Sequence, residues 1–556
     1  MKRIYPKHVF AALVLLCGLG APAMLRAQEE RTLAPVSGTY AITNATVIQA
    51  PGRKLEHGTV VVKNGLISAV GKGIAIPPEA IVIKGDSLTI YAGFIDGLSR
   101  TGVTKPKDEN KEKPKDPGNP SPERAGITPQ NDVRDFLNPA DKSVEELRAL
   151  GFTTAQVVPY GGMLPGSGAI VSLGASSPDK MVLLSKTAFY SELTTAERVY
   201  PNTVLGVMAK YRELYRQAVQ AKAYESLYAS NRAGLERPSP DRILEAFYPV
   251  IDKRIPVVFK TEKILDLQRA FTLQADLGFP LIAANVKEGW DMLPRVKATG
   301  TKVFLSLDLP EEKKEEKKDP KAKPDPEKDQ LEKRKAEFVT LYAAQAGAFQ
   351  KAGIPFGFST LTAKTKDIPA NLRRMIKAGL TEDQALAALT TNAAQILGLS
   401  DRLGSIDNGK IANLVITDKS YFDEKSKVRY VFVDGTLYKF EAKETKKSDG
   451  KKVDVSGTWS YSTETPQGAN NGKLKLKKDG DNYTGTITST FSDKEIELKS
   501  VSVEGSQLTF TYTIRVQGSG VNVEATATVD GDAFDGSMTA GQYGSFPMKG
   551  TKDPNR

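Results

Sequence analysis

The stretch IPVVFKTEKILDLQRAFTLQADLGFPLIAA, residues 255–284, indicates the fold of the central part of the chain. Its apolar run Ile255–Lys260 predicts a buried strand, and the helical period that follows predicts a helix ending at Gly278. Pro280–Ala284 then predicts a second buried strand. Two strands with a helix between them favour parallel pairing, because the helix carries the chain back to the starting edge of the sheet.

The same alternation of strands and helices extends from about residue 88 to residue 399. Capping boxes at Ser143–Glu146 and Thr381–Gln384, and the pair Ser239-Pro240, predict three helix starts. Repeated strand–helix units over about 300 residues predict an α/β fold, most simply a TIM-like (β/α)8 barrel. Further strands are expected at Thr89–Asp96, Thr153–Pro159, Thr301–Leu307 and Pro355–Ser359.

Three segments have the composition of flexible chain. Residues 105–123 and 311–335 are rich in Lys, Glu and Pro and carry almost nothing apolar, so they are predicted as surface insertions in the barrel. The end of the second insertion is expected to join the helix after it. Residues 441–452 are predicted as a linker between two domains.

Both sides of this central region have the pattern of β structure. Residues 33–90 predict short strands at Tyr40–Gln49, Thr59–Lys63 and Leu66–Val70. Residues 453–552 predict seven consecutive antiparallel strands, one of them at Ile496–Val503, with similar Asp-Gly hairpins at 479–480 and 530–531. This part of the chain is therefore expected to form a C-terminal all-β domain, a small barrel or sandwich.

The first 27 residues predict a secretory signal peptide. Lys2 and Arg3 precede an apolar run from Val9 to Leu19, and small residues follow it. Cleavage is expected after Ala23 or Ala27, which predicts a periplasmic or secreted protein with no membrane insertion after cleavage. The formal net charge of +11 lies largely in Lys-rich runs without interleaved aromatic residues, so nucleic-acid binding is not expected.

Histidine and cysteine are scarce. The 556 residues contain only His8, His57 and Cys17 of these two types. A site built from several imidazoles or thiolates is therefore excluded. His57 lies between Glu56 and Gly58 and is expected to be a solvated turn residue.

Five motifs resemble the amidohydrolase superfamily, in particular its imidazolonepropionase-like and exported dipeptidase-like members. They are Tyr91–Asp96 (YAGFID), Gly379–Leu386, Thr391–Gly398, Arg402–Lys410 (RLGSIDNGK) with Ala412–Ile416, and Val433–Gly435 (VDG). The resemblance implies a (β/α)8 barrel at residues 91–402, flanked by a composite β domain from residues 33–90 and 403–440. It also implies hydrolysis of amide or cyclic amide bonds by a water bound to a metal such as zinc.

The positions that the resemblance assigns to metal ligands carry other residues here. Leu98 and Arg100 stand at the two histidine positions that follow the first strand. Phe259-Lys260-Thr261 stands where the superfamily has its next histidine motif. Asn285 stands at a further histidine position, and Leu361 at the position of the aspartate. No metal site and no cofactor are therefore expected. The catalytic residues stay unknown, and the pocket candidates are Asp96, Ser99, Arg100, Lys260, Glu262, Asn285, Glu288 and Ser359.

Two interpretations of the charged residues at this site remain open. Oxygen ligands from Asp96, Glu262, Glu288 and Asp308 would suit Mg²⁺ or Ca²⁺. The cations Arg100, Lys260 and Lys287 lie at the same strand ends and would oppose a divalent ion. We therefore favour ion pairing between these groups over a metal site.

Two hypotheses about function follow. In the first, the chain is a non-catalytic member of the superfamily, either a partner subunit of an active amidohydrolase or a ligand-binding protein. In the second, it is a hydrolase acting on carbon–nitrogen bonds in amides, cyclic amides or dipeptides, with an atypical metal site or none. A third, weaker idea gives the C-terminal β domain its own role in binding an apolar ligand or a partner, which an open apolar interior would favour.

Overall fold

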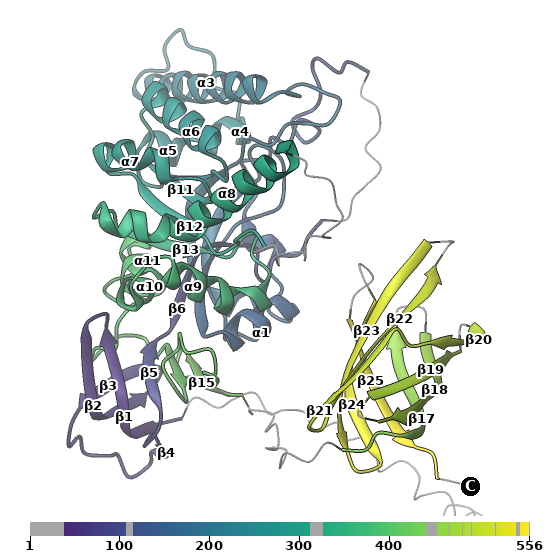
Figure 1. Cartoon of the computed structure of the whole chain (residues 1–556). Helices are drawn as coiled ribbons and strands as arrows, with labels where there is room; N and C mark the ends of the chain where they lie inside the picture. Colours follow the sequence, from purple (N-terminus) through teal and green to yellow (C-terminus); the bar gives the residue numbers. More distant parts are fainter. Residues whose placement is uncertain are drawn as a thin grey trace, which may run out of the picture. The chain divides into compact units, whose positions relative to one another are not determined.

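The chain forms two compact units, Met1–Phe440 and Glu441–Arg556 (Figure 1). The computed structural model describes residues 38–106, 115–311, 326–440, 453–465, 468–480, 482–490, 492–516, 519–540 and 545–554. The predicted signal peptide and the predicted linker lie outside these residues, as do 107–114 and 312–325 of the two predicted insertions. The end of the second insertion joins the helix α8 (Pro326–Lys351), as expected.

The first unit is built around an eight-stranded sheet in the order β13-β12-β11-β10-β9-β8-β7-β6. Neighbouring strands run parallel except β8, which pairs antiparallel with both β7 and β9. The strands are β6 (Phe94–Ser99), β7 (Phe152–Val157), β8 (Gly166–Ser172), β9 (Val182–Ser191), β10 (Val257–Lys260), β11 (Leu281–Val286), β12 (Lys302–Ser306) and β13 (Phe356–Ser359).

The reversed strand departs from the expected eightfold strand–helix repeat. Only residues 158–165 connect β7 to β8, which is too short for a helical crossover, so the chain turns back as a hairpin. The sheet is barrel-like, but a regular (β/α)8 barrel is not confirmed.

Helices cover the outer face of this sheet (Figure 1). The longer ones besides α8 are α1 (Lys142–Ala149), α3 (Val204–Ser230), α6 (Ile264–Leu277), α7 (Leu293–Thr299), α9 (Ile368–Lys377), α10 (Glu382–Leu389) and α11 (Thr391–Leu397). The shorter ones are η1 (Val133–Phe136), α2 (Pro178–Met181), α4 (Arg242–Glu245), α5 (Tyr248–Ile251), η2 (Trp290–Met292) and η3 (Thr365–Asp367). Among the described residues, no helix is long and apolar enough to cross a membrane.

One of the three predicted helix starts is confirmed and two are wrong. The Thr381 side chain accepts the Gln384 amide at 3.2 Å and caps α10. The N-cap of α1 is Asp141 rather than Ser143, because the Asp141 carboxylate accepts the Ser143 amide at 2.9 Å. Asp241 caps α4 in the same way, so the helix begins after the Ser239-Pro240 pair.

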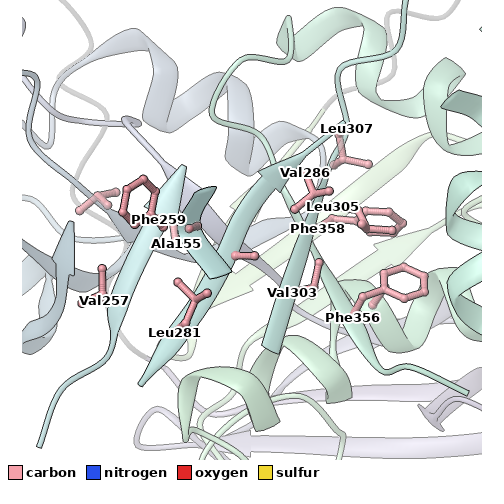
Figure 2. Packing of buried hydrophobic residues seen from close by; sticks show 14 of the residues in the cluster. Ala155, Val257, Phe259, Leu281, Val286, Val303, Leu305, Leu307, Phe356 and Phe358 are labelled. Carbon is pink, nitrogen blue, oxygen red and sulfur yellow. The ribbon is translucent and has the colours of Figure 1, made fainter. Parts of the chain in front are cut away.

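Both faces of the central strands are buried, which explains their continuous apolar runs. Val257 and Phe259 of β10 point into the outer cluster shown in Figure 2, which also contains helix residues such as Phe271. Val258, between them, belongs to a second cluster on the inner face with Phe304. The buried-strand prediction for residues 255–260 is thus confirmed, with the ordered strand beginning at Val257.

A second sheet joins the two ends of the first unit. It contains β1 (Tyr40–Ala50), β2 (Arg53–Lys63), β3 (Leu66–Gly71), β4 (Ile81–Lys84), β5 (Thr89–Ala92), β14 (Leu414–Thr417), β15 (Val428–Val433) and β16 (Thr436–Lys439). β5 pairs with β1 on one side and with β14 on the other.

The single strand expected at Thr89–Asp96 is in fact two strands, β5 and β6, that belong to different sheets. The chain changes sheet at Gly93, where a Cβ atom would lie 2.3 Å from Thr153 Oγ1. Only glycine allows this close approach of the two segments.

The C-terminal unit is an antiparallel sheet in the order β20-β19-β18-β17-β25-β24-β23-β22-β21. Its strands are β17 (Gly457–Thr465), β18 (Gly468–Asp479), β19 (Asn482–Ser489), β20 (Ser492–Glu497), β21 (Ser500–Glu504), β22 (Gln507–Val516), β23 (Ser519–Asp530), β24 (Ala533–Ala540) and β25 (Ser545–Lys552). The strand expected at Ile496–Val503 is divided, because the Leu498 and Lys499 amides bond to Gly485 and Thr511 on two different strands. The final strand, β25, was not predicted.

Side chains fill the inner face of this sheet. Trp459, Phe510, Leu508 and Phe534 are buried together there. A concave region of about 910 Å³ is lined by residues of five strands, among them Ser460, Tyr461, Phe534 and Thr551.

Candidate functional site

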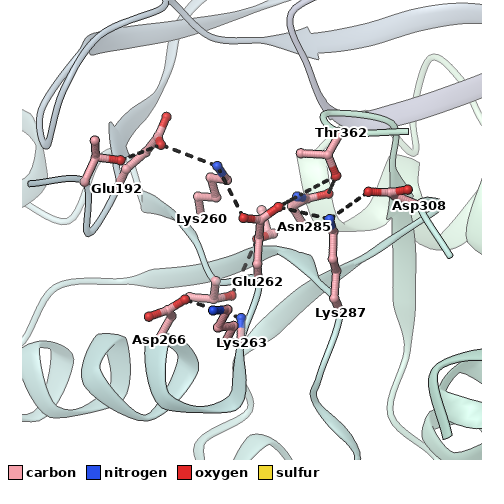
Figure 3. A network of polar contacts seen from close by, with 12 residues as sticks. Glu192, Lys260, Glu262, Lys263, Asp266, Asn285, Lys287, Asp308 and Thr362 are labelled. Atoms are coloured by element: carbon pink, nitrogen blue, oxygen red, sulfur yellow. Dashed lines mark hydrogen bonds and ion pairs between the residues drawn. The ribbon is translucent and has the colours of Figure 1, made fainter. Parts of the chain in front are cut away.

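The carboxyl ends of the parallel strands meet at one edge of the central sheet, which we call the mouth. Lys260, Glu262, Asn285 and Lys287 come from the ends of β10 and β11 and face one another there (Figure 3). Asp96, Ser99 and Arg100 come from β6, Ser359 from β13, and Glu288 from the loop after β11. Parallel strands explain this gathering, since residues far apart in sequence share one edge.

Six charged side chains at the mouth form a continuous chain of ion pairs. Arg100 Nη2 lies 2.6 Å from Glu192 Oε1, and Lys260 Nζ lies 3.6 Å from Glu192 Oε2 and 3.5 Å from Glu262 Oε2. Lys287 Nζ lies 3.2 Å from Glu262 Oε1. Lys287 also lies 2.7 Å from Asp308 Oδ2, which ends the chain of alternating charges.

This arrangement holds the cations in place. Burial lowers the pKa of Lys287, but its hydrogen bonds to Asp308 and Glu262 and their charges raise that pKa overall. Lys287 therefore stays protonated at neutral pH and keeps its two carboxylate partners occupied. The ion pairing favoured from the sequence is present for Arg100, Lys260 and Lys287.

Glu192 joins Arg100 to Lys260 in this chain and was not among the residues expected at the site. Its carboxylate accepts hydrogen bonds from Tyr190 at 2.9 Å and Thr194 at 3.0 Å besides its two ion pairs. Glu192 follows β9, a strand that was not expected from the sequence. The short apolar run at 188–190, which ends two residues before Glu192, is the feature of the sequence that could have indicated this strand.

Asp96 takes no part in these ion pairs. Its carboxylate is fully buried and accepts the Thr360 amide at 3.0 Å, the Leu98 amide at 3.2 Å and the Thr360 hydroxyl. Burial raises the pKa of Asp96 to about 7, although these hydrogen bonds act in the opposite direction. Ser99 lies 3.2 Å from the Thr360 hydroxyl and 2.8 Å from that of Thr101, which extends the cluster.

Asn285 and Ser359 link β11 to β13 at the mouth. Asn285 has a φ of +58°, which is strained for a residue other than glycine. Its amide donates to Glu262 at 3.1 Å and to the Thr362 hydroxyl at 3.2 Å. Ser359 Oγ donates to the Leu98 carbonyl at 2.8 Å and lies 3.4 Å from Asn285 Oδ1.

Glu288 lies apart from the ion-pair chain. Its carboxylate accepts the Tyr342 hydroxyl at 2.7 Å and the Ile264 amide at 3.3 Å. His57 lies on β2, where its Nδ1 is 2.9 Å from Asn44 Oδ1 on the exposed surface. It is therefore part of a strand rather than a turn.

The donor set at the mouth does not fit a catalytic zinc ion. Zinc sites use imidazole, thiolate and carboxylate ligands, and here each carboxylate of the ion-pair chain already contacts a cation. Within the part of the chain that the structure describes, no three His, Cys, Asp or Glu side chains gather as a metal site. Of the four carboxylates considered for an oxygen-ligand site, Glu262 and Asp308 are paired with Lys287, whereas Asp96 and Glu288 accept hydrogen bonds from Thr360 and Tyr342.

Removal of the Glu192 charge should destabilise the first unit. In Glu192→Gln, Arg100 and Lys260 would keep their charges but lose the carboxylate between them, and we expect a loss of about 2–3 kcal/mol in the free energy of unfolding. Urea unfolding can be followed by Trp290 fluorescence in a Trp459→Phe background, because the chain has two tryptophans.

Glu79→Gln is the matched control, since its pair with Lys63 is exposed and should contribute less than about 1 kcal/mol. Equal losses in the two variants would contradict a special role for Glu192.

Comparison with known proteins agrees with this architecture. Residues 283–438 match the model of the Amidohydrolase family. An amidohydrolase structure from Thermotoga maritima MSB8 has a TM-score of 0.60 and 22% identity, over 72% of this chain and 100% of that one. A Xaa-Pro dipeptidase structure with bound methionine has a TM-score of 0.38 and 12% identity, over 72% of this chain and 100% of that one. A search of curated proteins gave no match.

The first unit therefore has the amidohydrolase fold. The family match covers β11 to β16 and the helices between them, including the RLGSIDNGK motif. The family model thus matches this part of the chain, and the solved structure shows the shared fold.

Proposed function

We propose that this chain is a non-catalytic protein of the amidohydrolase superfamily in which the metal ligands are replaced. The proposal rests on one observation, the chain of ion pairs at the mouth. Arg100 and Lys260 stand at or beside positions that the resemblance assigns to metal ligands, and each contacts Glu192. Three part-buried cations are paired with the carboxylates of Glu192, Glu262 and Asp308, so a divalent cation would have to displace a lysine or arginine to use these carboxylates as ligands.

The role we propose for it is that of a partner subunit of an active amidohydrolase or of a ligand-binding protein. It would be exported to the periplasm or secreted after removal of residues 1–27. We also propose that the central sheet is a (β/α)8 barrel in which the direction of β8 is locally reversed. Fold alone does not decide activity, so this role must be tested on the site itself.

Metal content is the first test. Elemental analysis of the exported, processed protein is expected to show no stoichiometric divalent metal, including after equilibration with Zn²⁺ or Mn²⁺ and removal of unbound ions. Glu262→Ala, which removes a carboxylate shared by Lys260 and Lys287, serves as the comparison. A stoichiometric ion in the parent protein that is lost in Glu262→Ala would contradict the proposal.

A second candidate function is hydrolysis of a carbon–nitrogen bond without the usual metal. The contact of the Asp96 carboxylate with the Thr360 hydroxyl, beside Ser99, favours it, because an acid next to a hydroxyl can act as a general base. Asp96 is fully buried and Ser99 is 2% exposed, which argues against access to substrate. Turnover of a dipeptide or cyclic amide that is abolished in Ser99→Ala, with unfolding unchanged, would favour this function over the first.

A further inference from the structure

The central sheet has one seam that its backbone does not close. Strands β6 and β13 stand at the two ends of the strand order, and every other neighbouring pair is joined by a ladder. Across the described residues of these two strands, no backbone ladder joins β6 to β13. The seam between them must therefore be held by side chains.

Four hydrogen bonds across this seam lie at the mouth, and we call them the clasp. The Asp96 carboxylate accepts the Thr360 amide at 3.0 Å and the Thr360 hydroxyl. Ser359 Oγ donates to the Leu98 carbonyl at 2.8 Å, and Ser99 Oγ lies 3.2 Å from the Thr360 hydroxyl. Each involves at least one side chain, so the clasp can release while the ladders of both strands with their other neighbours stay intact.

Next to the clasp, both strands of the seam carry a glycine. A Cβ atom on Gly97 of β6 would lie 2.0 Å from Phe304 Cδ1, and one on Gly357 of β13 would lie 2.6 Å from Phe304 Cε1. The Phe304 ring from β12 therefore packs against glycine on both strands. At these two positions neither β6 nor β13 has a side chain of its own that reaches across the seam.

The ion-pair chain leaves the same seam free. Its members come from the ends of β6, β9, β10, β11 and β12, and they run from Arg100 round to Asp308. None comes from β13. The two ends of the chain lie on either side of β13, so separation of β6 from β13 breaks none of these ion pairs.

We propose that the mouth opens by separation of β6 from β13 at this seam. The clasp, in which Asp96 and Thr360 are the main partners, holds the seam closed. Opening there widens the mouth while the ion-pair chain keeps the remaining strand ends together. This device is independent of whether the protein has catalytic activity.

Hydrogen exchange of the full chain tests the proposal directly, because the Thr360 amide donates across the seam to Asp96. In the wild-type protein this amide is expected to exchange faster than those of Val258 and Phe259, which lie in a strand with ladders on both sides.

Thr360→Val removes the hydroxyl and keeps the amide. It should speed exchange in peptides from 94–101 and 356–362 by about tenfold, with β10 and β11 unchanged. Thr362→Val, which removes a hydroxyl bonded to Asn285 on the other side of β13, is the control and should leave the seam unchanged. Equal acceleration in all strands, or seam amides in the wild type as slow as those of β10, would overturn the proposal.

Discussion

Asp96→Asn is expected to abolish a fall of about 4 kcal/mol in the stability of the first unit between pH 4 and pH 8. Burial raises the pKa of Asp96 from its ordinary value of 3.8 to about 7, against the smaller effect of its hydrogen bonds. Asn cannot ionise, so the variant should lack this part of the pH dependence. The large effect follows from the complete burial of the carboxylate, which no cation contacts among the described residues.

The sign follows from the protons bound in each state. Between pH 3.8 and about 7 the folded chain keeps the Asp96 proton, whereas the unfolded chain has lost it. The favourable contribution is thus complete below pH 3.8 and is lost as the pH rises through about 7. Burial also raises the pKa of Asp434, so this residue contributes a fall of stability with rising pH in the wild type and in every variant.

The measurement is urea unfolding at a series of pH values, read from Trp290 in the Trp459→Phe background. Asp86→Asn, at an exposed position between β4 and β5 of the second sheet, controls for the removal of an acid. A wild-type stability that rises with pH over this range, or an unchanged slope in Asp96→Asn, would show that the carboxylate is ionised in its folded environment.

Gly97→Ala is expected to destabilise the first unit by about 3 kcal/mol. The new Cβ would lie 2.0 Å from Phe304 Cδ1 and 2.1 Å from Cε1. The same ring atoms also lie close to Gly357, where a Cβ atom would be 2.6 Å from Cε1 and 2.7 Å from Cδ1. An added methyl group in such a densely packed site forces either the ring or the strand to shift.

A double variant identifies the ring as the cause. Phe304→Leu alone leaves a small cavity, but it also makes room for the methyl group, so Gly97→Ala/Phe304→Leu should lose less stability than the sum of the single variants. Gly38→Ala, where the nearest atom to a Cβ is Tyr40 Cε2 at 3.5 Å, should change stability by less than about 0.5 kcal/mol. Additive losses would mean that another contact limits Gly97.

Much of the fold follows from local sequence pattern. Apolar runs without alternation predicted strands buried on both faces, and β10 to β13 are such strands. Helix starts were harder, since Asp141 and Ser143 are equally good capping residues and only the path of the chain decides between them. The direction of β8 depends on the short connection to β7, which pattern alone does not reveal.

The candidate site, too, has features that the sequence determines and features that only the tertiary structure determines. Composition alone excluded imidazole and thiolate sites, because a side chain that is absent from the sequence cannot be supplied by folding. The ion pairs at the mouth, by contrast, depend on the tertiary structure. Arg100, Glu192 and Lys260 lie far apart in sequence and meet only because their strands end at one edge of the sheet. Electrostatic partners depend on distance in space, whereas burial and secondary structure are already visible in the periodicity of neighbouring residues.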